Sequence, residues 1–205
     1  MYRHVCFRLF GIAVFICVSC VHHRNFSLHE DKLVAYMWNN HKELISHMLN
    51  YQAQGAIIYM INNQRKGYIP FIWTKDNDNC HIKLFNVFGL TIISISVENG
   101  VVSIFSNISS QNNNLKNEVQ KWFVDISYFL EQLQKWLLGL PNSNSEYNLN
   151  SIGCLSHINY CYNNKNISIH YRYYHTNSIP ILPKVLDVYY DQYYIRVIIN
   201  NWSIR

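Results

Sequence analysis

The chain has 205 residues, 49% of them hydrophobic and 14% charged, with a formal net charge of +5. This length supports one domain with a substantial core, and the positive charge is too scattered along the sequence to track a nucleic-acid backbone. No nucleic-acid partner is therefore expected. The 16 tyrosines and the low charged fraction are typical of a protein rich in β-strands.

The N-terminal residues have the pattern of an export signal. Arg3 and Arg8 accompany the apolar run Leu9–Val18, which has the length of a signal-peptide core and is too short to span a membrane. We expect a signal peptide over residues 1–19 that is removed from the mature protein. Its removal leaves 186 residues and takes both arginines away, so the net charge falls from +5 to +3.

Ser19 and Cys20 end the apolar run in a way that resembles a bacterial lipobox. In that motif the cysteine becomes the N-terminus of the mature protein and carries acyl chains. Cys17 stands where the motif usually has leucine. We expect lipidation at Cys20 and a lipidated tether over residues 20–27. The alternative is an ordinary secretory signal that is cut nearby, with Cys20 incidental.

A helix is predicted after the tether. Ser27 and Glu30 have the spacing of a capping box, in which each side chain satisfies a backbone N–H of the first turn. Apolar residues then recur at intervals of three and four, at Val34, Trp38, His41, Ile45 and Met48. We expect the helix to end near Asn50 and to pack this stripe against another element.

From residue 54 the apolar period changes to two, which predicts five strands separated by short turns. The strands are Gln54–Ile61, Gly67–Thr74, Asn79–Asn86, Thr91–Val97 and Val101–Asn107. Their short connections indicate an antiparallel meander. Pro70 lies inside the second strand and predicts an edge or bulged strand, because proline cannot donate a ladder hydrogen bond.

Helical spacing returns over Leu115–Leu138, where the apolar surface is too wide for one surface helix. We expect two short helices, broken near residues 125–127, each packed on a sheet. Gly139 and Pro141 supply the helix end. After a polar loop over Asn142–Asn150, four more strands are predicted: Cys154–Tyr162, Ile167–Tyr174, Lys184–Tyr190 and Tyr193–Trp202.

The motifs that most enzymes need are missing from the sequence. The seven glycines are isolated, so they form no phosphate-binding or dinucleotide-binding loop. His29 and Glu30 begin a zinc-protease pattern, but Leu33 occupies the place of the second histidine. We therefore expect no enzyme activity, no metal site and no cofactor other than the covalent lipid.

Three cysteines remain in the mature chain after the lipidation site: Cys80, Cys154 and Cys161. An odd number argues against a disulfide framework. Cys154 and Cys161 fall in one predicted strand, seven residues apart, which is too far for a bond. We interpret all three as packing residues, with a bond from Cys80 to one of the others as the alternative.

Several motifs, taken together and in this order, are similar to the LolB family of outer-membrane lipoprotein receptors. They are Trp38 with His41, Tyr51-Gln52 with Gly55, Phe71-Ile72-Trp73, the run Leu133–Pro141, and the ending Asn201–Arg205. The resemblance extends from Trp38 to Arg205. Its most specific parts are the Trp-x-x-His opening and the Trp-Leu-Leu-Gly-Leu-Pro run that starts at Trp136.

The resemblance implies a mainly β fold with helices: a curved, incomplete antiparallel β-barrel of about 9–11 strands over residues 28–205. Helices would lid an apolar cavity for acyl chains. The candidate cavity and lid residues are Trp38, Ile45, Trp73, Trp122, Phe129, Leu133, Trp136 and Leu137. Without the resemblance, the same apolar pattern favours a filled core, because a filled core and a lined cavity have the same sequence pattern.

The function that the resemblance implies is lipoprotein transfer. The protein would accept lipoproteins from the periplasmic carrier LolA and insert them into the inner leaflet of the outer membrane, without nucleotide hydrolysis. We expect a monomer on the periplasmic face, whose partners are a LolA-like carrier, client lipoproteins and that leaflet. Val21 follows Cys20 where retention in the inner membrane would favour aspartate, which also indicates the outer membrane.

The loop Asn86–Leu90 joins two strands but carries apolar side chains where polar turn residues are usual. In the family this loop projects an exposed leucine that is needed for insertion into the membrane, and this chain departs from that leucine. The aligned position here is Phe88, with nearby Leu90 as the alternative tip. The other function left open is a structural or binding lipoprotein of the envelope with a filled β core.

Overall fold

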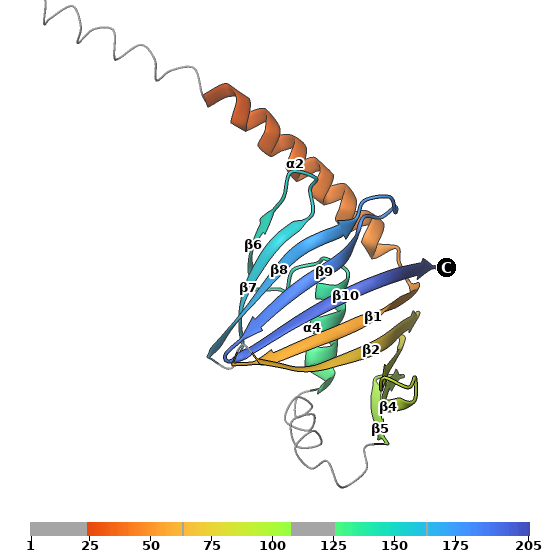
Figure 1. Cartoon of the computed structure of the whole chain (residues 1–205). Helices are drawn as coiled ribbons and strands as arrows, with labels where there is room; N and C mark the ends of the chain where they lie inside the picture. Colours follow the sequence, from red (N-terminus) through yellow and green to blue (C-terminus); the bar gives the residue numbers. More distant parts are fainter. Residues whose placement is uncertain (1–23, 63, 108–125, 163) are drawn as a thin grey trace, which may run out of the picture.

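The structure is a computed structural model of the whole chain, and it describes residues 24–62, 64–107, 126–162 and 164–205. One antiparallel sheet of ten strands forms the body of the molecule (Figure 1). The first half of the chain supplies β1 (Asn50–Ile61), β2 (Gln64–Asp76), β3 (Asn79–Phe85), β4 (Thr91–Glu98) and β5 (Val101–Ser106). The second half supplies β6 (Glu146–Leu149), β7 (Leu155–Tyr162), β8 (Lys165–His175), β9 (Leu182–Tyr190) and β10 (Tyr193–Ile204).

The sheet is curved and open, with β5 at one edge and β6 at the other. Its order is β5-β4-β3-β2-β1-β10-β9-β8-β7-β6. The first described strand, β1, therefore pairs with the last, β10, from Tyr51 opposite Ile204 to Ile61 opposite Tyr193. This pairing joins two meanders into one surface. The predicted fold class is confirmed as mainly β with helices, in an antiparallel sheet that does not close into a barrel.

Two described helices lie against this sheet: α2 (Arg24–Ser46) and α4 (Ile126–Leu137). α4 lies within the curve of the sheet, whereas the first turns of α2 extend beyond it (Figure 1). Buried side chains of both helices belong to the same apolar cluster as the strand residues, including Trp38, Ile45, Trp136 and Leu137. The helices thus cover the inner face of the sheet.

The strand connections depend on residues that tolerate positive φ. Such residues stand at five turns: Asn62, Asn77, Asn99, Asn164 and Asp191. At the β4–β5 turn, Asn99 is followed by Gly100 with φ 78°, so two consecutive residues have positive φ, as two-residue hairpins require. Asparagine is therefore frequent at the predicted turns because it adopts positive φ more readily than most other residues.

The end of α4 is a Schellman motif. Gly139 has φ 74°, its N–H donates to the Trp136 carbonyl, and the N–H of Leu140 donates to the carbonyl of Lys135. This confirms the prediction that Gly139 takes a left-handed conformation just after the helix. The described helix covers Ile126–Leu137, and the predicted first helix and the break near residues 125–127 stay predictions, because residues 108–125 lie outside the described residues.

Two helix boundaries differ from the prediction. α2 begins at Arg24, inside the range expected to be a tether, and ends at Ser46 rather than near Asn50. The capping-box prediction at Ser27 was wrong, because helical hydrogen bonding continues back past this residue. Asn50 instead begins β1.

Two strand predictions also need correction. β2 lies between β1 and β3, so it is not an edge strand. It does contain a bulge, because Tyr59 and Met60 of β1 pair with Gly67 and Arg65 and leave Lys66 as the extra residue. β3 pairs only with Phe71–Asp76, so Pro70, opposite Ala56, lies just beyond that ladder and removes no hydrogen bond from it. The predicted polar loop at 142–150 contains the edge strand β6, whose four residues are too few for their polar–apolar alternation to indicate a strand.

The three cysteines in the described part of the chain are free. Cys80 and Cys154 are buried, and burial raises the pKa of each thiol to about 11, so both stay neutral packing groups. Cys161 is exposed, so its prediction as a packing residue was wrong. It lies near the β7–β8 turn, where the side chain reaches solvent. Cys154 lies just before β7 rather than inside it.

Candidate functional site

The inner face of the sheet is apolar along nearly its whole width. Residues at alternate positions in each strand point to this face, as the period of two predicted. The fully buried ones include Tyr51 and Ala53 of β1, Phe71 and Trp73 of β2, Ile93 and Ile95 of β4, Ile158 of β7, Ile169 of β8, Leu186 of β9 and Ile199 of β10. The strands therefore present one continuous apolar surface to the helices.

The structure brings most of the predicted cavity and lid residues together on this surface. Trp38 and Ile45 come from α2, Trp73 from β2, and Trp136 and Leu137 from α4, and each is between 2% and 4% exposed. Leu133 is partly buried and packs against the same cluster. Trp122 and the side chain of Phe129 lie outside the described residues. These residues thus form the interior between sheet and helices.

A buried polar chain holds the C-terminal end of α4 to the rest of the molecule. Trp136 Nε1 donates to Asn142 Oδ1, and Asn142 Nδ2 donates to Gln132 Oε1 at 2.6 Å. From the sheet, the hydroxyl of Tyr171 donates to the Trp136 carbonyl at 3.0 Å. Buried polar groups in such a chain are satisfied, so they fix the helix without an unpaired group.

α2 packs closely against the β6–β7 edge of the sheet, where Gly153 lets the helix approach the backbone. A Cβ on Gly153, which has φ 69°, would lie 2.5 Å from the Met37 Cβ. The ring of Trp38 stacks on His41, with centroids 5.7 Å apart, and contacts Tyr147 of β6 at 5.8 Å. Burial lowers the pKa of His41 below 6.5, so its ring is neutral at neutral pH.

Two buried polar atoms of this interior have no hydrogen-bond partner among the described residues, Trp38 Nε1 and His41 Nε2, whereas the buried hydroxyl of Tyr51 interacts with Trp73. The four side chains come from α2, β1 and β2. Buried polar groups in folded proteins are usually paired. The otherwise apolar interior therefore retains groups that can hydrogen-bond with the polar end of a bound molecule.

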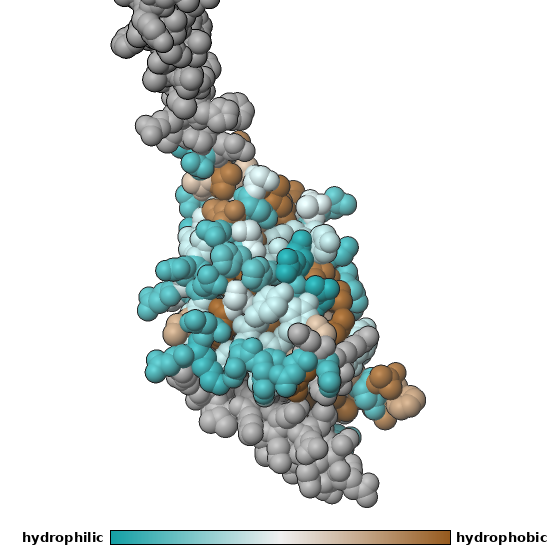
Figure 2. Space-filling view, turned by 60° about the vertical axis from the view of Figure 1, so that its left-hand side comes forward, coloured by the Kyte–Doolittle hydropathy of each residue, from teal (hydrophilic) through white to brown (hydrophobic). Residues whose placement is uncertain are grey.

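The β3–β4 loop projects its apolar side chains into solvent. Phe88 is 85% exposed, and Val87 and Leu90 are 77% and 65% exposed. The Asn86 carboxamide oxygen accepts from the N–H of Phe88 at 3.0 Å and from the N–H of Leu90 at 2.9 Å. Figure 2 shows apolar side chains at the end of the molecule where β4 and β5 lie. Asn86 thus holds a tight turn with Phe88 as its most exposed residue.

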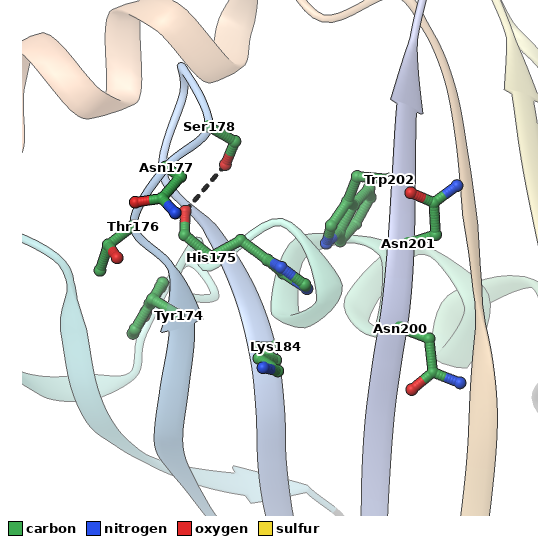
Figure 3. Close-up of a pocket in the computed structure, with 9 residues that line it drawn as sticks. All are labelled: Tyr174, His175, Thr176, Asn177, Ser178, Lys184, Asn200, Asn201 and Trp202. Atoms are coloured by element: carbon green, nitrogen blue, oxygen red, sulfur yellow. Dashed lines mark hydrogen bonds between the residues drawn. The ribbon is translucent and has the colours of Figure 1, made fainter.

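A pocket of about 360 Å³ lies between the β8–β9 loop and the end of β10 (Figure 3). The rings of His175 and Trp202 point toward one another across it. Their ring nitrogens bond to backbone carbonyls, His175 Nε2 to Ile199 at 2.9 Å and Trp202 Nε1 to Pro183 at 3.0 Å. These polar groups are already committed, so they fix the loop on β10 and offer no catalytic set.

The outer face of the sheet carries a charged cluster around Asp187, whose side chain is fully buried. Its carboxylate accepts from Arg172 Nε at 2.7 Å, from Arg196 Nε at 2.7 Å and from the Tyr194 hydroxyl at 2.9 Å. Burial raises the pKa of Asp187, but the hydrogen bonds from Arg196, Arg172 and Tyr194 outweigh it and hold this pKa below 3.8. The cluster ties β8, β9 and β10 together.

Sequence reasoning missed Asn86, the Gln132–Asn142 chain and the Asp187 cluster. An asparagine before an apolar turn is a signal that could have indicated the loop clamp. The two other groups join residues on successive elements, 6 to 15 positions apart, and the periods of a single helix or strand do not indicate such contacts. Over the ranges that the structure describes, no three His, Cys, Asp or Glu side chains gather closely enough to hold a metal.

Comparison with known proteins identifies the family. Residues 49–202 match the family described as "Outer membrane lipoprotein LolB". The outer-membrane lipoprotein LolB of Sodalis glossinidius (strain morsitans) is 27% identical over 205 residues, covering 98% of both chains. That of Baumannia cicadellinicola subsp. Homalodisca coagulata is 29% identical over 171 residues, covering 81% of this chain and 78% of the relative.

Among solved structures, a LolA superfamily protein from Nitrosomonas europaea aligns with a TM-score of 0.48 and 8% identity, over 84% of this chain and 93% of that one. In the described part of the chain, neither helix is long and apolar enough to cross a membrane. The family match covers about three quarters of the sequence, and the chain therefore belongs to the LolB family of outer-membrane lipoproteins.

Proposed function

We propose that this protein accepts lipoproteins from a LolA-like carrier, holds their acyl chains between the sheet and the helices, and inserts them into the inner leaflet of the outer membrane. The observation that carries the proposal is the continuous apolar inner face of an open ten-stranded sheet, covered by two helices. LolB is a family of receptors rather than enzymes, and the transfer uses no nucleotide hydrolysis.

The energetics of acyl chains explain why such an interior is needed. Each buried methylene contributes about 0.8 kcal/mol, so three chains of about sixteen carbons carry on the order of 40 kcal/mol. Cargo of this kind cannot cross water unshielded. Transfer without fuel then requires that each successive site bind the chains more strongly than the one before, with the membrane last.

In this proposal the predicted interior residues contact the cargo. Trp38 and Ile45 of α2, with Trp136 and Leu137 of α4, form the lid side, and Trp73 belongs to the sheet side. Both helices have their apolar stripes turned to the sheet, so a small outward movement of either would expose the interior. The unpartnered polar atoms of Trp38 and His41 would face the polar end of the cargo.

The β3–β4 loop is proposed to contact the leaflet during insertion. Phe88 is the most exposed of its apolar side chains, and Leu90 lies beside it. Burying one phenylalanine contributes only about 1.5–3 kcal/mol, which is too little to anchor the protein. The proposed anchor is the lipid on Cys20, so the loop would act locally, by loosening lipid packing where the cargo enters.

The test is a transfer assay with two separate readouts, uptake of a lipoprotein from the carrier and its delivery to vesicles. Phe88→Glu should leave folding and uptake unchanged and stop delivery, because a charge at the loop tip cannot enter the leaflet. Tyr173→Glu is the matched control, since Tyr173 is an exposed aromatic residue of β8, 66% exposed. Unchanged delivery by the Phe88 variant would show that the assignment is wrong.

One observation favours the second candidate, a binding lipoprotein with a filled core. The described interior residues are nearly inaccessible to solvent and form one contiguous cluster. A filled core would take up neither a lipoprotein nor a fluorescent acyl probe, whereas the receptor would take up both. Uptake by the purified mature chain therefore separates the two functions.

A further inference from the structure

We propose that α2 is an interfacial helix, whose outward apolar residues lie on the surface of the membrane to which the chain is anchored. This inference rests on the proposed function, because it takes the lipid on Cys20 as the anchor. It assigns α2 a second role besides covering the inner face of the sheet. Leu33, Tyr36 and Leu44 carry the inference and are called the outer stripe.

The outer stripe consists of large apolar side chains that are open to solvent. Leu33 is 53% exposed, Tyr36 is 71% exposed and Leu44 is 36% exposed. At about 100° per residue, their spacing of three and eight residues places them on one side of the helix, within roughly 80° of each other. Figure 2 shows apolar side chains at the upper end of the molecule, where α2 lies.

The outer stripe is distinct from the stripe that packs on the sheet. Trp38 and Ile45 are buried and belong to the core cluster. The third side of the helix carries Ala35 and Asn39, which are exposed. α2 therefore has one apolar side against the protein, one solvent side on which three large apolar residues surround the exposed Asn40, and a third side without large apolar residues. A helix that lies between a protein and an interface has such an arrangement.

The position of the anchor identifies the membrane as the occupant of the outer stripe. Cys20 precedes the helix start at Arg24 by four residues, which span at most about 14 Å. Along the helix, Leu33 lies about 14 Å and Leu44 about 30 Å beyond Arg24. A helix standing on the membrane would lift both leucines into water, whereas a helix lying flat places the whole stripe at the interface.

The charges on α2 and its position in the fold are both consistent with a helix that lies flat on the membrane. Asp31, Lys32, Lys42 and Glu43 balance one another on the described part of α2, so contact with lipid would depend on apolar burial and little on salt. The first turns of α2 extend beyond the sheet, which leaves this part of the helix free to approach a surface (Figure 1). The helix that closes the interior would thus also touch the leaflet that receives the cargo.

The test measures the depth of single spin labels in the full-length, lipidated chain on phosphatidylethanolamine–phosphatidylglycerol vesicles. The parent carries Cys161→Ser, because Cys161 is exposed whereas Cys80 and Cys154 are buried. Labels are placed by Leu33→Cys, Tyr36→Cys and Leu44→Cys. The matched controls, Ala35→Cys and Asn39→Cys, lie at similar positions along the helix but on its polar side.

Labels on the outer stripe should collide mainly with oxygen dissolved in the bilayer, and control labels mainly with a water-soluble nickel chelate. The two groups should differ by about tenfold in the ratio of these collision rates, and high salt should not change it. Equal access of nickel to all five labels would overturn the inference. Labels of the outer stripe that neither reagent reaches would show that protein covers it, which also overturns the inference.

Two further readouts separate this inference from the proposed function. If the lipidated chain sediments with vesicles and delivers cargo while the label pattern is absent, only the interfacial helix is overturned. If the lipidated chain does not sediment with vesicles, the anchor fails, and this inference fails with it. A Cys20→Ala chain should lose both sedimentation and the label pattern, and retention of the pattern would overturn the role given to the tether.

Discussion

Asp187 is the residue on which three strands of the outer face converge. Its fully buried carboxylate accepts hydrogen bonds from Arg172 of β8 and from Tyr194 and Arg196 of β10. Asp187→Asn removes the charge and leaves two guanidinium groups facing each other. We expect Asp187→Asn to lower the free energy of unfolding by about 2–4 kcal/mol, measured by urea denaturation at neutral pH. Both arginines reach solvent, and this limits the loss.

Asp191→Asn is the matched control for this variant. Asp191 pairs with Lys165 at 3.2 Å, but both side chains are more than half exposed, so the change should stay within about 0.5 kcal/mol. The pKa of Asp187 is lowered in the folded protein, so its charge stabilises the fold above the ordinary pKa of 3.8. The difference between wild type and Asp187→Asn should therefore shrink as the pH falls below that value. Equal stability of the two variants at neutral pH would contradict the role given to Asp187.

His41 makes the stability of the lid helix depend on pH. Burial lowers the pKa of His41, so the unfolded chain takes up a proton at a higher pH than the folded chain does. Stability that is present above pH 6.5 is then lost as the pH falls toward the folded pKa. We expect the wild type to lose more unfolding free energy between pH 7.5 and 5.5 than His41→Gln does, as urea titrations at both pH values would measure.

His170 is the internal reference for that comparison. Burial and the nearby Arg172 also lower the pKa of His170, and this residue is present in both proteins. Its contribution to the pH dependence therefore cancels between wild type and variant. Parallel pH profiles of the two proteins would mean that His41 is solvated in the folded state.

At the scale of elements, the register of β1 and β10 depends on one glycine. The pairing of the two strands shifts between Gln54 and Gly55, and a Cβ on Gly55 would lie 1.9 Å from the carbonyl oxygen of Ile198. Gly55→Ala must therefore push the two central strands apart. We expect a loss of about 3 kcal/mol or more in unfolding free energy, measured by urea denaturation.

The neighbouring substitution Gln54→Ala is the control, because Gln54 is exposed on the same strand. It should change the unfolding free energy by no more than about 0.5 kcal/mol. If Gly55→Ala does not fold, it should be absent from the soluble fraction while Gln54→Ala is present there at the wild-type level. That result would also show that the strand pairing requires glycine at position 55. Two variants of equal stability would show that the bulge can absorb a methyl group.

The elements that sequence reasoning predicted well are those with a strong local period. β3, β4, β5 and β10 begin at the predicted residues, because alternating apolar positions and Asn-Gly or Asp turns define them locally. β6 was missed because its four residues alternate polar and apolar over too short a stretch to be told from the polar loop around them. The internal place of β2 could not be predicted either, since Pro70 is tolerated only through the short ladder with β3.

The candidate site was predictable in part for the same reason. Trp38, Trp73 and Trp136 belong to motifs of the family, and the structure places them in one cluster. The polar groups that organise the site are not set by local pattern. Asn142 accepts from the indole of Trp136 because the chain turns back after α4, and Gly153 admits the distant helix α2 to the far edge of the sheet.

At the scale of the whole molecule, the receptor function requires space between the sheet and its helices. Ala53 offers a way to measure that space, because it is fully buried on the inner face of β1, opposite Trp73 of β2. Ala53→Leu adds three carbons to the interior without adding charge. A hollow interior should accept them and lose room for cargo, whereas a filled core should be overpacked.

For a hollow interior, we expect Ala53→Leu to keep or raise the unfolding free energy and to weaken binding of a fluorescent fatty acid by about tenfold, because the leucine takes volume from the acyl chain. A filled core would instead lose about 1–3 kcal/mol in unfolding free energy and bind no probe in either form. Ala35→Leu, on the exposed polar side of α2, is the matched control and should change neither quantity. Destabilisation by Ala53→Leu without any probe binding by the wild type would therefore reject the receptor function in favour of the filled core.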